Sequence, residues 1–289
     1  MKFAVFSVST PEYSPEVAVE KLKEFGYDGI EWRIFDQDPN AQGPSFWARN
    51  KATLPFATFE RDAAKWRDLT AKAGLEMPAL GTYVTCDDLE GVESAMRGAT
   101  TLGVSQLRVR APGYDGAEPF RLIWDTAREQ YTEVAGLAQR HGVRALLELH
   151  HGTVTPSASA ARLFLGDLNP AHVGVIHDAG NMVFEGFEGH RLSLEMLGPY
   201  LAHVHIKNAR WFPEKYNKDG SIKWKCDWAP IHKGVTDMRA LFRALHDTGY
   251  DGWVAVEDFS GERKLEDRLR ENLAYLKQVD NETAAEVAS

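Results

Sequence analysis

The sequence predicts an α/β fold in which eight parallel strands close into a single (β/α)8 TIM barrel. Short apolar runs alternate with helical patterns along the chain, eight of each. Strict alternation of this kind gives parallel strands joined by right-handed crossovers. Four of the later runs also end in a side chain able to bind a metal. This suits a barrel, because sites of that fold gather at the carboxyl ends of the strands.

The first half of the chain supplies four of the predicted units. Ser14 is a typical helix cap, and Gly26 ends the helix that follows it. The next strand alternates apolar residues with Glu31 and Arg33, which places this charged pair in the barrel lumen. The predicted strands here cover 2–7, 29–34, 77–84 and 106–111, and the helices cover 15–25, 59–73, 89–102 and 119–141.

The second half continues the series without a break. Its strands are short apolar stretches, which is typical of parallel strands buried on both faces. They cover 144–150, 173–178, 201–207 and 253–258, and the helices cover 157–165, 188–197, 236–248 and 262–278. We therefore expect residues 1–289 to form one TIM-barrel domain.

Two connections are too long for ordinary loops of this fold. Residues 36–58 contain several prolines and aromatics. Residues 209–233 contain five aromatics and a turn at 217–220 that fits between two short strands. Both follow the carboxyl end of a strand, so we expect them on the active-site face, with Trp211 among the substrate contacts. Packing over the barrel rim, or against a neighbouring subunit, is the alternative for the second loop.

Composition narrows the class of partner. The net charge of −9 and the dispersion of the 33 basic residues argue against nucleic acid. We expect a small-molecule carbohydrate substrate, no membrane association and a homo-oligomer. Residues 1–9 indicate a first strand rather than a secretory signal, and two cysteines cannot form a disulfide framework. A cytoplasmic protein is the resulting expectation.

Four residues stand where the last four strands turn polar: Glu148, Asp178, His205 and Glu257. Side chains alternate across a strand, so this parity selects one candidate ligand from each strand. Three carboxylates and one imidazole suit one divalent metal ion, Mn²⁺ first, with Mg²⁺, Co²⁺ and Zn²⁺ as alternatives. Charged strand ends without a metal are the other interpretation of any one of these residues.

Parity also assigns the neighbouring polar residues. His150 and Lys207 share the ligand face one step nearer the mouth, where we expect them to contact substrate. Arg108 and Arg110 share a face of the fourth strand and either bind substrate or form a salt bridge with Glu31 in the lumen. Glu31 itself is a further candidate for substrate contact.

This set of residues predicts proton transfer next to a carbonyl. A divalent metal that holds two neighbouring oxygens of a hydroxy-ketone acidifies the carbon-bound proton and stabilises the enediolate. Glu148 and Glu257 on opposed strands could then remove and return the proton. The expected function is isomerisation or epimerisation of an unphosphorylated keto-sugar or keto-polyol, and the spacing leaves the choice between the two open.

Four segments carry a resemblance to a known family: Leu147–His150, His177–Met182, His203–Lys207 and Val256–Glu257. In them the sequence resembles the xylose-isomerase-like TIM-barrel superfamily, the sugar phosphate isomerase/epimerase group. The resemblance implies that the four candidate ligands bind one divalent metal and that the two glutamates are the acid/base pair. Asn181 stands where epimerases of this group usually carry a substrate-binding histidine. We therefore expect an altered substrate contact at Asn181.

A second resemblance changes the chemistry. Glu148-Leu-His150 followed by His151-Gly-Thr is similar to the catalytic subunit of C-glycoside deglycosidases. That similarity implies a metal-dependent lyase that cleaves 3-keto-C-glycosides, with His150 as base and a small second subunit as partner. A non-catalytic sugar-binding barrel is the third alternative.

Overall fold

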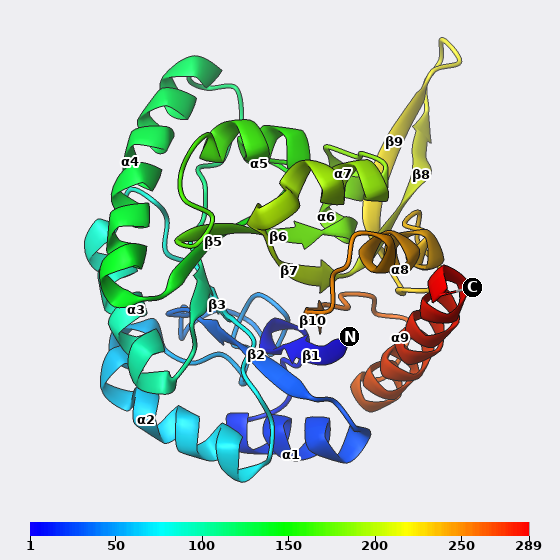
Figure 1. Cartoon of the computed structure of the whole chain (residues 1–289). Helices are drawn as coiled ribbons and strands as arrows, with labels where there is room; N and C mark the ends of the chain where they lie inside the picture. The colour runs from blue at the N-terminus through cyan, green and yellow to red at the C-terminus, as the bar shows by residue number, and fades with distance from the viewer. Residues whose placement is uncertain (289) are drawn as a thin grey trace.

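The computed structural model describes residues 1–288 and shows a closed barrel of eight parallel strands in the order β1-β10-β7-β6-β5-β4-β3-β2 (Figure 1). The predicted fold class is confirmed. The barrel strands are β1 (Lys2–Phe6), β2 (Gly29–Ile34), β3 (Leu80–Thr82), β4 (Gln106–Arg108), β5 (Arg144–Glu148), β6 (Val173–Asp178), β7 (Leu201–Ile206) and β10 (Trp253–Val256).

Helices surround the barrel on all sides (Figure 1). They are α1 (Pro15–Phe25), α2 (Phe56–Lys72), α3 (Leu89–Leu102), α4 (Phe120–His141), α5 (Ala158–Leu165), α6 (Ala179–Phe184), α7 (His190–Leu197), α8 (Met238–Asp247) and α9 (Leu265–Ala288), with 3₁₀ turns η1 (Ser7–Ser9) and η2 (Gly198–Tyr200). The short α6 was not predicted. It starts directly after β6 because the Asp178 side chain caps it, accepting a hydrogen bond from the Asn181 backbone N–H at 2.8 Å.

The observed β3 and β4 are shorter than the predicted strands. Regular pairing between them is limited to Leu80 and Leu107, and beyond it Thr85 and Arg110 meet only as an isolated bridge. The chain stays extended past the end of regular pairing, so Arg110 still reaches the mouth of the barrel.

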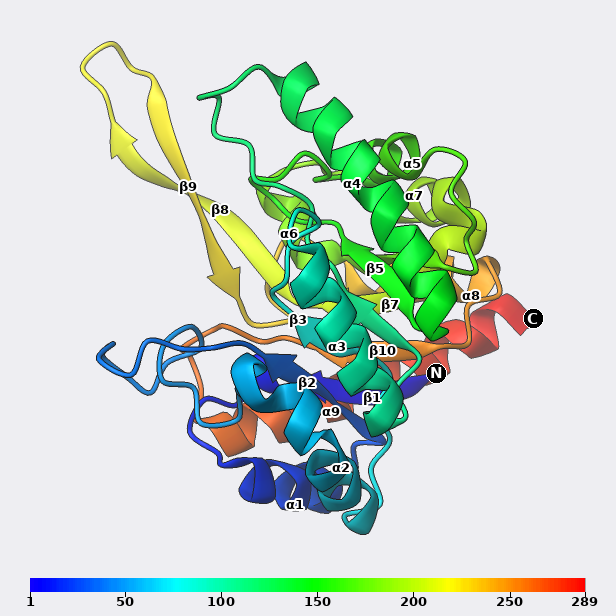
Figure 2. The same cartoon turned by 90° about the vertical axis from the view of Figure 1, so that its left-hand side faces the viewer.

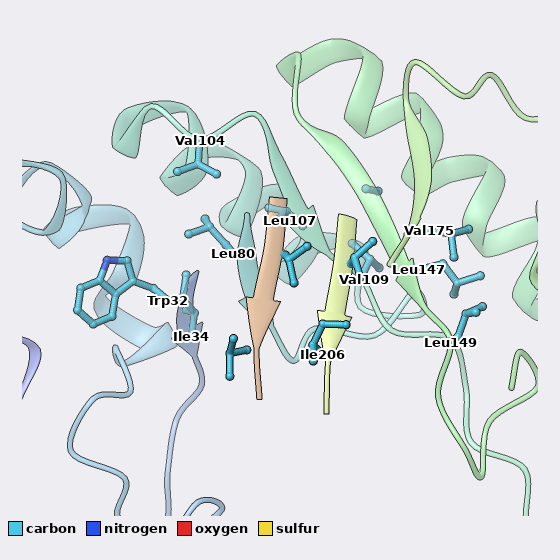
Figure 3. Close-up of a cluster of buried hydrophobic side chains, with 14 of the residues drawn as sticks. Trp32, Ile34, Leu80, Val104, Leu107, Val109, Leu147, Leu149, Val175 and Ile206 are labelled. Atoms are coloured by element: carbon cyan, nitrogen blue, oxygen red, sulfur yellow. The ribbon is translucent and has the colours of Figure 1, made fainter. Parts of the chain in front are cut away.

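The main core lies between the barrel and its helices. Alternate residues of the strands point outward and pack there. Figure 3 labels ten side chains of this core, which come from β2 to β7 and from residues next to them. A second, smaller apolar cluster of Ala79, Leu146 and Ile176 fills the lumen. The lumen is thus packed rather than open, as expected for this fold.

The segment after β7 forms an antiparallel ribbon of β8 (Asn208–Tyr216) and β9 (Ile222–Ala229), longer than the two short strands expected there. The ribbon projects well beyond the barrel (Figure 2). Residues 36–58 remain mostly irregular and are tied to the barrel through Arg33, whose Nη1 donates to Phe46 O at 3.3 Å and to Thr53 Oγ1 at 3.0 Å. Within residues 1–288, no helix combines the length and apolarity needed to cross a bilayer.

Candidate active site

The four predicted ligands come together at the carboxyl ends of β5, β6, β7 and β10. Register brings them there: Asp178 pairs with His205 across β6 and β7, and His205 pairs with Ala255 across β7 and β10. One ligand atom from each of the four residues lies within 4.8 Å of the others, and all four side chains are buried. The barrel therefore assembles one compact cluster from residues that span more than a hundred positions of the chain.

His205 occupies the centre of this cluster. Its Nε2 lies 2.9 Å from Glu31 Oε2, and since a carboxylate only accepts, Nε2 carries the proton. Its Nδ1 makes no hydrogen bond within residues 1–288, yet it lies 3.2 Å from Glu257 Oε1 and 3.4 Å from Glu148 Oε1. Glu31 thus fixes the ring so that its second nitrogen faces the carboxylates.

Two permanently charged side chains hold the carboxylates together. Lys207 Nζ lies 2.8 Å from Asp178 Oδ2 and also contacts Glu257, while Arg108 Nη1 lies 2.5 Å from Glu148 Oε2. The salt bridge considered between this strand and Glu31 does not form for Arg108, because Glu148 on the adjacent strand β5 is its carboxylate partner. Lys207 was expected one step nearer the mouth, in contact with substrate. Its Nζ instead lies deeper, among the candidate ligands.

Burial and neighbouring charge set the protonation of the cluster. Burial acts to raise the pKa of Glu148, but Arg108 and Lys207 outweigh it and hold that pKa well below its ordinary value. The pKa of Glu257 is lowered in the same way, since Lys207 and His205 outweigh burial. Asp178 behaves differently: burial, opposed by Lys207 but reinforced by the two glutamates, raises its pKa to about 7.

A charge count tests whether a divalent ion fits. The cluster holds four carboxylates, those of Glu31 and the three candidate ligands, and two fixed cations, Arg108 and Lys207. Two of the four carboxylates therefore have no fixed cation in a buried site, where unpaired charge is unfavourable. Protons can compensate them when no metal is bound: Glu31 and Glu257 raise the pKa of His205 well above its ordinary value against the effect of burial, and burial raises the pKa of Asp178 to about 7. One divalent ion held by the free Nδ1 and the carboxylate oxygens supplies two positive charges, so the donor set fits.

Two further predicted residues lie beside the ligands rather than in the mouth. Glu31 is fully buried, and the same oxygen that meets His205 lies 2.9 Å from Nε2 of His203. Asn181 is also fully buried, and its Nδ2 donates to Leu149 O at 3.0 Å and to Glu148 Oε1 at 3.4 Å. In this structure both residues position metal-capable side chains.

His150 lies at the mouth as a neutral imidazole. Its Nδ1 is 2.7 Å from the backbone oxygen of His151, so Nδ1 carries the proton and Nε2 is an unprotonated base. Burial lowers the pKa of His150, opposed by Glu148. No hydrogen bond engages Nε2 among residues 1–288. A free base therefore lies beside the ligand cluster.

A small cavity of about 60 Å³ opens above the ligands. Predicted residues line it together with Trp47, from the 36–58 loop that was expected on this face, and with two aromatics that the sequence alone did not indicate, Phe6 and Tyr83. Trp211 does not line this cavity, because its indole N–H donates to Val183 O at 2.8 Å on α6. Trp228 from the same loop lies closer, with its ring 5.5 Å from Lys207 Nζ. Pairing puts Trp211 and Trp228 on the same face of the ribbon, so alternation did not distinguish them; Trp228 lies nearer the site because it stands at the end of β9 that returns to the barrel.

Comparison with known proteins identifies the family. A family described as xylose isomerase-like TIM barrel matches residues 19–279. The chain belongs to this family. A curated relative, the inosose dehydratase of Geobacillus thermodenitrificans, is 28% identical over 140 residues, which is 46% of each chain. The chain thus spans about half the length of the curated relatives it matches.

Solved structures share the fold along nearly the whole chain. An L-ribulose 3-epimerase superposes with a TM-score of 0.73 at 17% identity, covering 100% of this chain and 98% of that one. The 3-keto-D-glucoside 4-epimerase of E. coli gives 0.72 at 17% identity, covering 96% and 99%. Two further neighbours contain metals: the IolI protein with a bound zinc atom (0.71, 18% identity, 99% of each chain) and a Mycobacterium smegmatis family member in complex with magnesium (0.69, 18% identity, 98% and 97%).

Proposed function

We propose that the protein is a divalent-metal-dependent isomerase or epimerase of an unphosphorylated keto-sugar or keto-polyol. The observation that carries this proposal is the convergence of Glu148, Asp178, His205 and Glu257 in one buried cluster whose carboxylates, with that of Glu31, outnumber its two fixed cations. The similarity to epimerases and to an inosose dehydratase supports a carbohydrate substrate, since all of these names describe polyhydroxylated ketones or their glycosides. We expect Mn²⁺ as the ion, because the set is rich in carboxylates.

Glu148 and Glu257 are the proposed proton-transfer groups. When bound, the divalent ion would hold the substrate's carbonyl and adjacent hydroxyl oxygens and lower the energy of the enediolate. The low pKa values of both glutamates keep them ionised near neutrality, so each can accept a carbon-bound proton. They stand on β5 and at the end of β10, separated around the barrel by β6 and β7. The two carboxylates therefore approach a bound substrate from different sides, as epimerisation requires.

The other residues orient these groups and the substrate. Arg108 and Asn181 hold Glu148, and Lys207 holds Glu257. Arg110 lines the cavity and makes no ion pair among residues 1–288, so it is free to bind substrate oxygens. The cavity holds only about two water molecules. Some of the side chains that line the cavity must therefore shift for a sugar to enter, and exclusion of water would follow when they return.

A lyase acting on 3-keto-C-glycosides is the second candidate, and the state of His150 favours it. An unprotonated Nε2 beside the ligand cluster is a base that the two-glutamate mechanism leaves unused. In a lyase it would deprotonate the aglycone or the sugar carbon, and a divalent ion held by the ligand cluster would bind the keto oxygen. This version of the function also calls for a small second subunit.

Hydrogen exchange separates these functions. Protein reconstituted with Mn²⁺ would be incubated in D₂O with ketoses, inososes and 3-keto-glycosides, and carbon-bound deuterium and aglycone release would be followed by NMR. Deuterium incorporation with new stereochemistry supports the isomerase or epimerase, and aglycone release supports the lyase. Absence of exchange on every substrate, despite bound metal, would contradict both and leave a sugar-binding barrel.

The metal assignment has a separate test. Glu257→Gln keeps the shape of the side chain and removes one ligand charge, so both metal content and exchange should fall. Glu129→Gln on the exposed face of α4 is the matched control and should change neither. If Glu257→Gln protein kept its metal and its full exchange rate, the assignment would be wrong.

A further inference from the structure

The β8–β9 ribbon has one apolar and one charged face. Residues directly opposite one another share a face. Pairing places Trp211 with Cys226, Pro213 with Trp224, and Tyr216 with Ile222 on one face. The other face carries Phe212 and the ribbon's charged side chains, among them Arg210, Lys215, Lys223, Lys225 and Asp227. The ribbon is therefore amphipathic along its length, although it stands away from the barrel (Figure 2).

Only the inner half of the apolar face is covered. At the base, the Trp228 ring lies 4.6 Å from Phe184 and 5.3 Å from Phe259, and the Trp211 indole N–H donates a hydrogen bond to Val183 O on α6, although Trp211 is still 46% exposed. At the tip, Tyr216 is 70% exposed and Trp224 is 53% exposed. An isolated two-stranded ribbon is marginally stable in water. The outer half thus has the composition of a protein interface, and no other segment of the described chain covers it.

Charge indicates what kind of surface would cover the tip. The segment 208–229 has five basic and three acidic residues, whereas the whole chain carries a net charge of −9. Lys215 and Lys218 near the tip make no ion pair among residues 1–288. A positively charged arm on a strongly acidic body complements a second copy of that body.

The body carries a surface that matches the arm. A hollow of about 430 Å³ lies beyond the carboxyl ends of β3 and β4 and is lined by Asp87, Glu118 and Leu122 among others. Neither acid forms an ion pair within the described part of the chain. Beside the hollow, Leu122 is 58% exposed and Phe120 is 45% exposed. This surface offers unpaired negative charge and exposed apolar groups, the counterparts of the arm's lysines and aromatics.

We propose that the protein forms a twofold dimer in which the ribbon tip of each copy docks on the Asp87–Glu118–Leu122 hollow of the other. The hollow and the ribbon both follow the carboxyl ends of barrel strands, so they lie at the same end of the molecule and a twofold axis allows a reciprocal exchange. Trp224 is the central apolar anchor. A fully buried Trp or Tyr side chain covers about 150–250 Å². Because Trp224 is 53% exposed and Tyr216 is 70% exposed, the pair can add roughly 200–300 Å² per copy to a standard interface of about 800 Å² per partner.

A charge exchange tests the docking without disturbing the core. Sedimentation of the whole chain should show a dimer. Lys215→Glu with Lys218→Glu should raise the dissociation constant of the dimer at least about tenfold, and so should Asp87→Lys with Glu118→Lys, because each places like charges opposite one another. The variant with all four substitutions should recover the dimer.

Two further variants complete the test. Lys72→Glu with Lys264→Glu makes the same charge change on exposed helix and loop positions and should leave the dimer intact. Trp224→Ala should weaken it at least about tenfold. A monomeric native chain would overturn the proposal and leave the ribbon tip to another occupant, such as a glycoside. A dimer insensitive to the ribbon substitutions, or loss without recovery in the fourfold variant, would overturn it as well.

Discussion

Glu31→Gln is the sharpest probe of how the site is held. One carboxylate oxygen of Glu31 accepts hydrogen bonds from Nε2 of both His203 and His205, each at 2.9 Å. Gln keeps the shape and one acceptor oxygen but removes the charge. Hydrogen bonds to charged groups contribute about 1.5–3 kcal/mol and neutral ones about 0.5–1.5 kcal/mol. The stabilisation that the hydrogen bond to His205 Nε2 contributes should therefore fall by roughly 1–1.5 kcal/mol.

The expected result is a loss of metal affinity with the fold retained. Partners that orient a metal-binding histidine typically change affinity by about 10–100-fold when mutated, and tenfold corresponds to about 1.4 kcal/mol. We therefore expect the Mn²⁺ dissociation constant of Glu31→Gln, measured by titration calorimetry on metal-free protein, to rise about tenfold or more. Glu129→Gln serves as the control with native affinity. A dissociation constant within twofold of the native value would refute the role given to Glu31.

Two other substitutions test the packing and positioning of the site. In Gly180→Ala the added Cβ would lie 2.7 Å from the Lys207 backbone, so urea denaturation should show a loss of about 1–3 kcal/mol in the free energy of unfolding. The control Gly189→Ala has open space around its Cβ and should change this free energy by less than about 0.5 kcal/mol. Equal losses in the two variants would contradict the close approach at Gly180. Asn181→Ala removes the amide that donates to Glu148. We therefore expect kcat to fall about tenfold while KM changes less. A change confined to KM would instead make Asn181 a substrate contact.

The sequence was sufficient for the barrel and for the set of candidate ligands, because both depend on periodicity. Alternation along each strand determines which face a residue occupies, so Glu148, Asp178, His205 and Glu257 could be selected strand by strand. Height along the barrel axis follows a different rule. Strands in a barrel are tilted and staggered relative to one another, so a residue's position in its own strand does not give its depth relative to neighbouring strands.

Depth is where the sequence-based assignments differ from the structure. Glu31 lies against the buried faces of His203 and His205 instead of at the mouth, and Arg108 meets Glu148 across β4 and β5. Lys207 is nominally one step above His205, yet its long side chain turns back to Asp178. The direction that a long side chain takes depends on the charges near it, and the spacing of residues along a strand does not give the positions of those charges.

The fixed charges of the site would also let the chain fold before it binds a metal. Arg108 and Lys207 supply permanent partners for Glu148, Asp178 and Glu257, and His205 can carry a proton. The buried carboxylates thus keep part of their compensation from the chain itself, unlike a structural zinc site, where the metal supplies the folding energy. A divalent ion would then displace protons from a cluster that is already assembled. A metal bound in this way would suit catalysis, since the ligands would not have to be ordered when it binds.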